Sequence, residues 1–184
     1  MVYFDSKGAD NTEKTLQIAR DEALKRDVKH IVVASTRGNT GLHAAQLLQN
    51  TGIKLIVVGH STGHIEAGQQ LFDMELKKQI ENLGVTVYLG TDVLTGFPSA
   101  IRKRNRFSEE TIIADTLRMF GQGMKVAVEI VAMASDANLI PVADVIAVAG
   151  SGRGSDTCIL VGANGTHQFF DIRVREILAK PRDF

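Results

Sequence analysis

The chain has 184 residues and a mass of 20.0 kDa, a size at which a single domain can bury a well-formed hydrophobic core. Hydrophobic residues make up 44% of the chain and charged residues 23%, which excludes a disordered protein. The 21 basic and 21 acidic residues cancel, so no overall electrostatic field favours nucleic acid or an anionic membrane as a partner.

Cysteine usage and hydropathy both bear on the compartment in which the protein works. Cys158 is the only cysteine, so the chain can form neither an internal disulfide nor a zinc site built from several cysteines. The N-terminal residues are too polar for a signal peptide, and no apolar run approaches the roughly 18 residues of a transmembrane helix. Together these observations predict a protein of the reducing cytoplasm.

Short apolar runs typical of buried strands alternate along the chain with segments of helical periodicity. In chain order, the pattern predicts a helix over 10–26, a strand over 31–35, a helix over 42–50, a strand over 55–59, a helix over 72–83, a strand over 85–89, helices over 98–101, 108–120 and 124–138, and strands over 145–150, 158–164 and 167–174. Asp10, with Glu13 three residues later, has the capping-box pattern, so the first helix is expected to begin at Asp10. Buried strands that alternate with helices predict a parallel sheet covered on both faces.

The C-terminal strands are expected to pair as a hairpin. Asn164 and Gly165 separate two β-rich runs, and this dipeptide is typical of a two-residue hairpin turn. Phe170 and Ile172 alternate with charged neighbours, which is the pattern of a strand with one solvated face. The predicted fold is therefore one α/β domain over 1–184, with three α/β/α layers, a mostly parallel, doubly wound sheet and a C-terminal antiparallel β-hairpin.

The turn after the first predicted strand carries residues suited to binding an anion. The segment STRGNTG leads from the strand into a helix, whose N-terminal N–H groups and dipole attract negative charge. Gly38 and Gly41 allow the backbone to approach a ligand closely, and Arg37 can bind a phosphate through two hydrogen bonds. The alternative is an ordinary polar turn in which Asn39 or Thr40 caps the helix.

A second glycine-rich loop, SGRGSD, follows the predicted strand over 145–150. Gly150, Gly152 and Gly154 allow a sharp turn that presents backbone amides to an anion, and Arg153 adds a positive charge. The loop lacks the GK[ST] of a Walker A sequence, and a strand rather than a helix comes next. The alternative is a tight connection between strands that needs glycine for positive φ values.

These two loops are expected to flank one crevice. Both follow buried strands, so both lie at strand carboxyl ends, where a doubly wound α/β sheet binds its ligands. Two arginine-bearing loops at one crevice predict a phosphorylated ligand. The segment HSTGHIEAG after the second strand adds polar groups from His60 to His64, for which a surface loop without chemistry is the alternative.

Other features are less informative. The basic run over 102–106 could contact nucleic acid or a phosphate, but a solvated helix end or a subunit contact is the favoured interpretation. No metal is expected, because spacings such as HExxH and CxxC are absent, and spacing alone identifies no nucleophile with a neighbouring base. In the helix over 124–138, the polar stripe consists only of Lys125, Glu129 and Asp136. Edge pairing of the C-terminal strand would give a homo-oligomer.

At these motifs the chain resembles the C-terminal α/β domain of pyruvate kinase. The resemblance rests on TEKTLQIARDEA, IVVASTRGNTGLHAAQLL, KLIVVGHSTG and DVIAVAGSGRGSDTCILVGAN in this order, and it covers essentially the whole chain. With FDSKGADNTEKTL at the front and FFDIRVREILAKPR at the end, the chain is most similar to the stand-alone proteins of the pyruvate-kinase-C-terminal-domain-like family. The catalytic barrel of pyruvate kinase alone takes about 250 residues, so pyruvate kinase activity is not implied. The segment over 94–120 has no counterpart that we can place on the kinase domain.

The resemblance implies a ligand and a set of binding residues. In pyruvate kinase the loop corresponding to STRGNTG binds the phosphate of an allosteric sugar phosphate, and the stand-alone family is associated with flavin mononucleotide (FMN) in the same crevice. By analogy, residues 36–41 would hold the ribityl phosphate, while residues 60–63 and 150–157 would border the ribityl chain and the isoalloxazine. The candidate cofactor-binding residues are Ser35, Thr36, Arg37, Gly38, Asn39, Thr40, Gly41, His60, Ser61, Thr62, Gly63, Gly150, Ser151, Gly152, Arg153, Gly154, Ser155, Asp156 and Thr157.

Three hypotheses follow for the function. The favoured one is a protein that binds a small phosphorylated ligand, FMN foremost, either as a binding protein or as a flavin-dependent oxidoreductase. In that case Arg37, His60 and Arg153 are the candidates for tuning the flavin. The second is a non-catalytic regulatory or sensor module for a sugar phosphate or another phosphorylated metabolite. The third is an interaction or structural subunit with a vestigial crevice.

Overall fold

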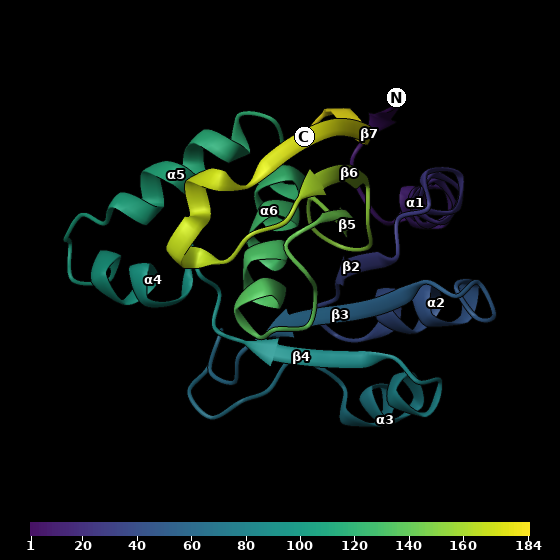
Figure 1. Ribbon diagram of the computed structural model, residues 1–184. Coiled ribbons are helices and arrows are strands. Elements are labelled where there is room, and N and C mark those ends of the chain that lie inside the picture. Colours follow the sequence, from purple (N-terminus) through teal and green to yellow (C-terminus); the bar gives the residue numbers. More distant parts are fainter.

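A seven-stranded sheet forms the middle layer of the protein in the computed structural model, which describes residues 1–184 (Figure 1). The strands are β1 (Val2–Ser6), β2 (His30–Ala34), β3 (Lys54–His60), β4 (Thr86–Gly90), β5 (Asp144–Ala149), β6 (Thr157–Gly162) and β7 (Arg173–Asp183). Their order across the sheet is β1-β7-β6-β5-β2-β3-β4. Neighbouring strands are parallel, except that β6 runs antiparallel to both β5 and β7.

Helices cover both faces of this sheet (Figure 1). They are α1 (Thr12–Arg26), α2 (Asn39–Leu47), α3 (Met74–Asn82), α4 (Gly96–Arg102), α5 (Glu109–Arg118) and α6 (Gln122–Asp136), with the short 3₁₀ segments η1 (Ala9–Asn11) and η2 (Thr166–Asp171). Helices α1, α2 and α3 pack on one face and α6 on the other, with α5 against α6. A helix with the length and hydropathy needed to traverse a lipid bilayer is absent from the structure.

Two hydrophobic cores lie on opposite faces of the sheet. Along β2, Ile31 and Val33 belong to the core beneath α1, α2 and α3, whereas Val32 belongs to the core beneath α6. Side chains of a strand alternate between faces, and both faces here are covered, so the strand is apolar throughout. The predicted three-layer α/β/α fold, with its mostly parallel, doubly wound sheet, is therefore confirmed.

The N-terminal region differs from the prediction in two respects. Strand β1 was not predicted, because Val2–Ser6 is too short and too polar to show the pattern of a buried strand. Helix α1 begins at Thr12, after η1, so Asp10 does not cap it. Thr12 Oγ1 donates a hydrogen bond to the carbonyl oxygen of Ala9 at 2.6 Å, and this short turn replaces the expected capping box.

The antiparallel pairing of the last two strands is confirmed, but the predicted turn between them is wrong. Gly165 has a φ of −85°, outside the positive range that an Asn-Gly hairpin turn requires. The chain instead forms η2, whose Thr166 donates from its backbone N–H and its hydroxyl to the Asp136 carboxylate, each at 2.8 Å. Phe170 lies in this segment and is 76% exposed, and β7 begins only at Arg173. The alternating pattern before β7 thus belongs to an irregular connection anchored to the end of α6.

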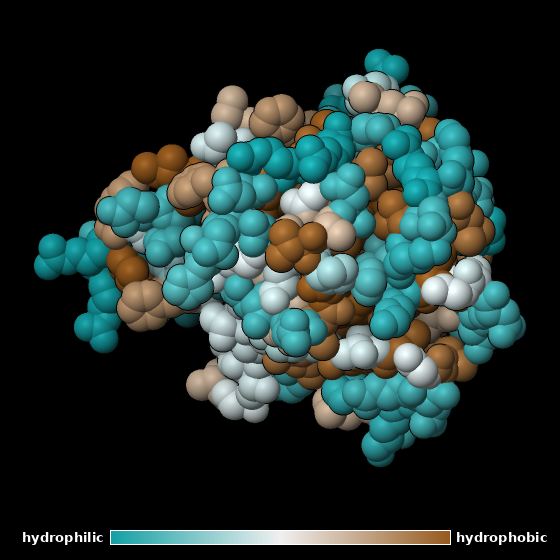
Figure 2. All heavy atoms as spheres, in the orientation of Figure 1, coloured by the Kyte–Doolittle hydropathy of each residue, from teal (hydrophilic) through white to brown (hydrophobic).

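The segment that carries α4 and α5 extends from the side of the molecule (Figure 1). Hydrophobic side chains gather on its surface among hydrophilic ones (Figure 2), where Phe97, Phe107 and Ile112 are exposed. This segment falls within residues 94–120, for which the resemblance to the kinase domain offered no counterpart. Its inner side contributes to the crevice described next.

Candidate functional site

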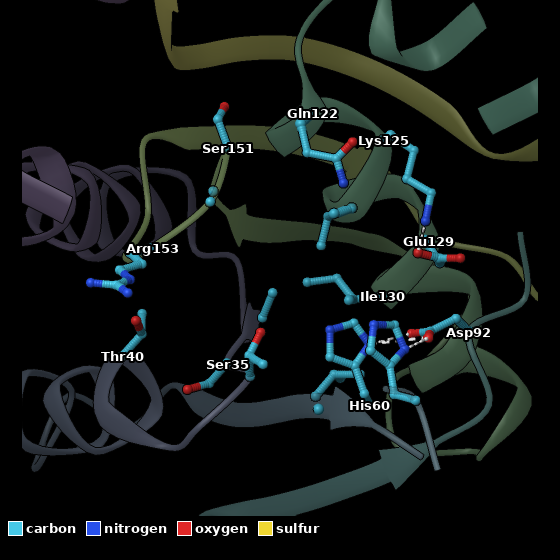
Figure 3. A pocket seen from close by; sticks show the side chains of 18 of the residues that line it. Ser35, Thr40, His60, Asp92, Gln122, Lys125, Glu129, Ile130, Ser151 and Arg153 are labelled. Carbon is cyan, nitrogen blue, oxygen red and sulfur yellow. Dashed lines mark hydrogen bonds and ion pairs between the residues drawn. The ribbon is translucent and has the colours of Figure 1, made fainter. Parts of the chain in front are cut away.

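The carboxyl ends of β2, β3 and β5 border a crevice with a volume of about 1070 Å³. In the sheet, β3 and β4 lie on one side of β2, while β5 and the strands beyond it lie on the other. A sheet that winds in both directions from adjacent strands leaves a hollow between the loops at that point. Thirty residues line this crevice, and Figure 3 shows side chains from the loops and from α6 converging on it.

The loop between β2 and α2 offers free hydrogen-bond donors to the crevice. Ser35 Oγ accepts hydrogen bonds from the backbone N–H groups of Gly38 at 3.2 Å and Gly41 at 3.1 Å, which hold the loop in shape. The N–H groups of Asn39 and Thr40, in the first turn of α2, have no partner within the protein. These donors and the helix dipole make this part of the crevice attractive to an anion.

The glycine-rich loop between β5 and β6 lies on the same side of the crevice (Figure 3). The Asp156 carboxylate accepts hydrogen bonds from the backbone N–H and the hydroxyl of Ser151, each at 3.2 Å, and so holds the loop from behind. A Cβ at Gly150 would lie 2.1 Å from the carbonyl oxygen of Gly154, so the chain can turn this tightly only with glycine there. Arg153 lines the crevice without a partner in the protein. We call these two loops the anion end.

Two histidines and a buried aspartate form the other end of the crevice, here called the histidine end. His60 is the last residue of β3, and Asp92 follows the end of the neighbouring β4. A carboxylate oxygen of Asp92 lies 2.9 Å from Nδ1 of His60 and another 3.0 Å from Nδ1 of His64. The two imidazole rings stack with centroids 3.7 Å apart. Burial acts to raise the pKa of Asp92, but the hydrogen bond from His60 and the charges of His60, His64 and Lys125 outweigh it and lower that pKa.

Lys125 and Glu129 form a buried ion pair on α6, close to the histidine end (Figure 3). They are 2% and 3% exposed, so the predicted polar stripe is not a solvated face at these positions. Glu129 accepts a hydrogen bond from the Leu94 N–H at 2.8 Å, and Lys125 donates to Thr95 Oγ1 at 3.2 Å. Burial lowers the pKa of the Lys125 ammonium, and the attraction of Glu129 offsets this only in part. The pair therefore fastens α6 to the segment that leads into α4.

The crevice is cationic, although the whole chain has no net charge. Six basic side chains line it against the two carboxylates of Asp92 and Glu129. The six are Arg37, Arg102, Lys103, Arg118, Lys125 and Arg153. All but Arg118 and Lys125 lack a hydrogen-bonding or ion-pair partner in the protein. Arg102 and Lys103 belong to the basic run of the sequence, for which a solvated helix end or a subunit contact was the favoured interpretation, and the structure places both at the crevice.

The structure divides the predicted cofactor-binding residues into two groups. Those that line the crevice are Ser35, Thr36, Arg37, Asn39, Thr40, His60, Gly150, Ser151, Gly152, Arg153 and Gly154. Those that do not line it are Gly38, Gly41, Ser61, Thr62, Gly63, Ser155, Asp156 and Thr157. In the second group, Gly41 packs against Val57, where a Cβ would come within 2.7 Å, and Asp156 is buried and shapes the loop beside it.

Several crevice residues were not predicted as site residues, and the sequence contains a signal for only some of them. Asp92 stands two residues after the end of β4, the strand that pairs with the one carrying His60. Lys125 and Glu129 stand four residues apart in a helix that is otherwise apolar on nearly all sides, which is typical of a buried helix. A charged pair on such a helix indicates an internal ion pair or a site.

The fold and the crevice define an α/β protein with a ligand-sized cavity at the switch point of its sheet. Among solved structures, a pyruvate kinase from Cryptosporidium parvum is similar, at 16% identity and a TM-score of 0.43, over 81% of this chain and 22% of that chain. Cryptosporidium parvum pyruvate kinase in complex with ADP gives 16% identity and a TM-score of 0.45, over 86% of this chain and 25% of that chain. Both are pyruvate kinases, the enzyme whose C-terminal domain the sequence resembles, and this chain spans 22–25% of their length. No protein-family model matches the chain.

Proposed function

We propose that the protein binds a small phosphorylated ligand in the crevice, with FMN as the foremost candidate. The observation that carries this proposal is the set of unpaired basic side chains, Arg37, Arg102, Lys103 and Arg153, that line one cavity in a chain of zero net charge. The free N–H groups of the first turn of α2 add donors to the same cavity. A phosphate group uses both features, because it combines negative charge with several acceptor oxygens.

The size and the lining of the crevice support FMN as a candidate. The volume of the crevice, about 1070 Å³, is slightly above the roughly 300–1,000 Å³ that is typical of small-molecule and cofactor pockets. Thr40 and Arg153 would hold the phosphate at the anion end, and Ile130 lies between the two ends (Figure 3). Val58 adds further apolar surface to the lining of the crevice. Bound FMN would supply redox chemistry, and the imidazole of His60 would set the polarity at the far end of the ring system.

Gel filtration with an absorption spectrum tests this ligand. We expect a flavin band to elute with the protein after FMN is added, and the band to weaken in Arg37→Ala. Loss of a charged hydrogen bond costs roughly 1.5–3 kcal/mol, which corresponds to about 10- to 150-fold in Kd. Arg104→Ala is the matched control, because Arg104 is an exposed arginine of the basic run that does not line the crevice. FMN that elutes separately from the unmodified protein would reject FMN as the ligand.

A sugar phosphate is the second candidate, because the crevice is largely polar. Six of its thirty lining residues are hydrophobic, and neither phenylalanine nor tyrosine is among them. A polyhydroxylated ligand suits such a surface, and a regulatory or sensor module would bind it without turnover. Thermal unfolding with sugar phosphates tests this candidate, since a ligand at a hundredfold excess over its Kd stabilises the protein by about 2.7 kcal/mol. A shift with the phosphorylated sugar but not with the free sugar supports it, and no shift with either counts against it.

A further inference from the structure

We propose that His60, His64 and Asp92 bind a divalent transition-metal ion, with the free coordination positions of the ion facing the crevice. The three residues come from two separate segments of the chain and meet at the histidine end. Figure 3 shows His60 and Asp92 there, on the opposite side of the crevice from Thr40 and Arg153. The site can be tested without any phosphorylated ligand, so its failure and the failure of the proposed function are distinguishable.

The register of two parallel strands brings the three residues together. His60 pairs with Gly90 at the ends of β3 and β4, and Asp92 follows two residues later. The Gln70 side chain donates a hydrogen bond to the carbonyl oxygen of His60 at 3.2 Å and so folds the intervening loop back toward the strand end. His64, in that loop, stacks on the His60 ring. The cluster is therefore a product of the sheet and of an internally bonded loop.

The potential ligand atoms converge at distances suited to one metal ion. Nδ1 of His60 lies 2.9 and 3.0 Å from the two carboxylate oxygens of Asp92, and Nδ1 of His64 lies 3.0 Å from one of them. The ligand atoms of all three residues lie within 4.8 Å of one another. Two ligands bonded at about 2.1 Å and at right angles are about 3.0 Å apart. A metal ion can thus replace the Nδ1 protons once the two stacked rings turn so that both Nδ1 lone pairs point at it.

The burial of Asp92 favours a cation at this position. Asp92 is 5% exposed, and the only basic groups that contact it are the two imidazoles. Lys125, on the neighbouring helix, is paired with Glu129 and acts on Asp92 only from beyond contact distance. A buried carboxylate is unfavourable unless a cation or several hydrogen bonds compensate its charge.

The chemistry of the ligand set points to a site with open positions. Two imidazoles and one carboxylate are the protein ligands of several zinc and non-haem iron sites in which substrate or water completes the coordination. The side chains of His60 and His64 are 28% and 34% exposed, and both line the crevice. A ligand bound in the crevice would therefore reach the ion directly.

The alternative for these residues is a hydrogen-bonded relay without metal. Each imidazole would donate its Nδ1 proton to Asp92 and present Nε2 to the crevice. In this arrangement Asp92 is not a metal ligand, and only the two Nε2 atoms remain to bind an ion, which predicts weaker binding than by three ligands.

Titration with Co²⁺ distinguishes the two arrangements. The full chain, without an affinity tag, is stripped with a chelator and titrated with Co²⁺, whose visible absorption reports its ligands. We expect one ion per chain and a spectrum typical of nitrogen and oxygen ligands. Loss of an outer hydrogen-bonding partner of a metal ligand costs roughly 10- to 100-fold in affinity. Loss of a ligand itself should cost at least the upper end of that range, so we expect Asp92→Asn and His64→Gln each to weaken Co²⁺ binding by at least about 100-fold.

His43→Gln is the matched control, because His43 lines the crevice but lies outside the cluster and contacts Glu13. Because His64 is partly exposed, His64→Gln should fold even if Asp92→Asn does not, so one ligand variant remains for the test. Circular dichroism checks the fold of each variant. No Co²⁺ spectrum in the unmodified chain, or equal affinities in His64→Gln and His43→Gln, would overturn the metal site in favour of the relay.

Discussion

Gly41 lies where α2 packs against β3, and no side chain fits at this position. A Cβ at Gly41 would lie 2.7 Å from Val57 Cγ1 and 3.2 Å from Ile80 Cδ1. We expect Gly41→Ala to lower the free energy of unfolding by about 1–3 kcal/mol, because overpacking forces core side chains out of their preferred rotamers. Urea denaturation measures this change. Gly152→Ala is the control, since a Cβ at Gly152 meets nothing within 4 Å, and equal losses in the two variants would contradict the packing role.

The thiol of Cys158 is expected to be unreactive in the folded protein, although cysteine is a reactive residue type. It is fully buried in β6, and burial raises the pKa of its thiol far above the ordinary value. The thiolate is the reactive form, and a raised pKa makes it rarer at any given pH. At about pH 8 we expect no modification of the folded protein by a thiol reagent, but rapid modification of one thiol per chain in guanidinium. Fast reaction of the folded protein would show that the strand opens readily.

Among the residues of the site, those with local signals could be predicted from the sequence. Arg37, Thr40 and Arg153 stand in glycine-containing turns directly after apolar strands, and all three line the crevice. The place of Asp92 depends on β3 and β4 being neighbours, and that of Arg102 on how α4 folds back. Neither relation is visible in a short stretch of sequence, which is why these two residues were not predicted as site residues.

At the scale of elements, α6 depends on a charged pair inside the protein. We expect Lys125→Met to lower the free energy of unfolding by about 3–5 kcal/mol, because it leaves the Glu129 carboxylate buried without its partner. The double variant Lys125→Met/Glu129→Gln removes both charges but keeps an acceptor for the Leu94 N–H, so it should recover most of that loss. Guanidinium denaturation of both variants measures the difference.

The pair of Lys77 and Glu81 on α3 serves as the control for this prediction. It has the same spacing of four residues but is partly exposed. Exposed pairs contribute little to stability, so Lys77→Met should cost less than about 1 kcal/mol. A similar cost for Lys77→Met and Lys125→Met would contradict the role of burial.

The buried elements were predictable because their hydrophobic periods are strong, whereas the connection between β6 and β7 was not. An Asn-Gly pair between β-rich runs has a local preference for a tight turn. In the structure, the Asp136 carboxylate at the end of α6 binds Thr166 and draws the chain into η2 instead. A tertiary hydrogen bond thus overrides a local turn signal.

At the scale of the whole molecule, β1 protects one edge of the sheet. It pairs in parallel with β7, with Val2 opposite Ala179. Removal of residues 1–6 would expose unpaired N–H and C=O groups along β7, and such an edge invites pairing with another chain. We expect the shortened chain to sediment as larger species than the full chain as concentration rises. Tyr3→Ala keeps the backbone of β1 and should sediment as the full chain does; unchanged sedimentation of the shortened chain would contradict this role of β1.

The pairing of β1 with β7 also sets an order of events during synthesis. Val2 and Ala179 stand near opposite ends of the chain, so β1 leaves the ribosome long before its partner exists. Closing so long a loop in an unfolded chain is entropically unfavourable. Pairing of β1 with β7 therefore becomes favourable only after the intervening strands have assembled. The nascent domain therefore carries an unpaired β1 until β7 has been synthesised, and the amides of β1 should be among the last to gain protection from hydrogen exchange during refolding.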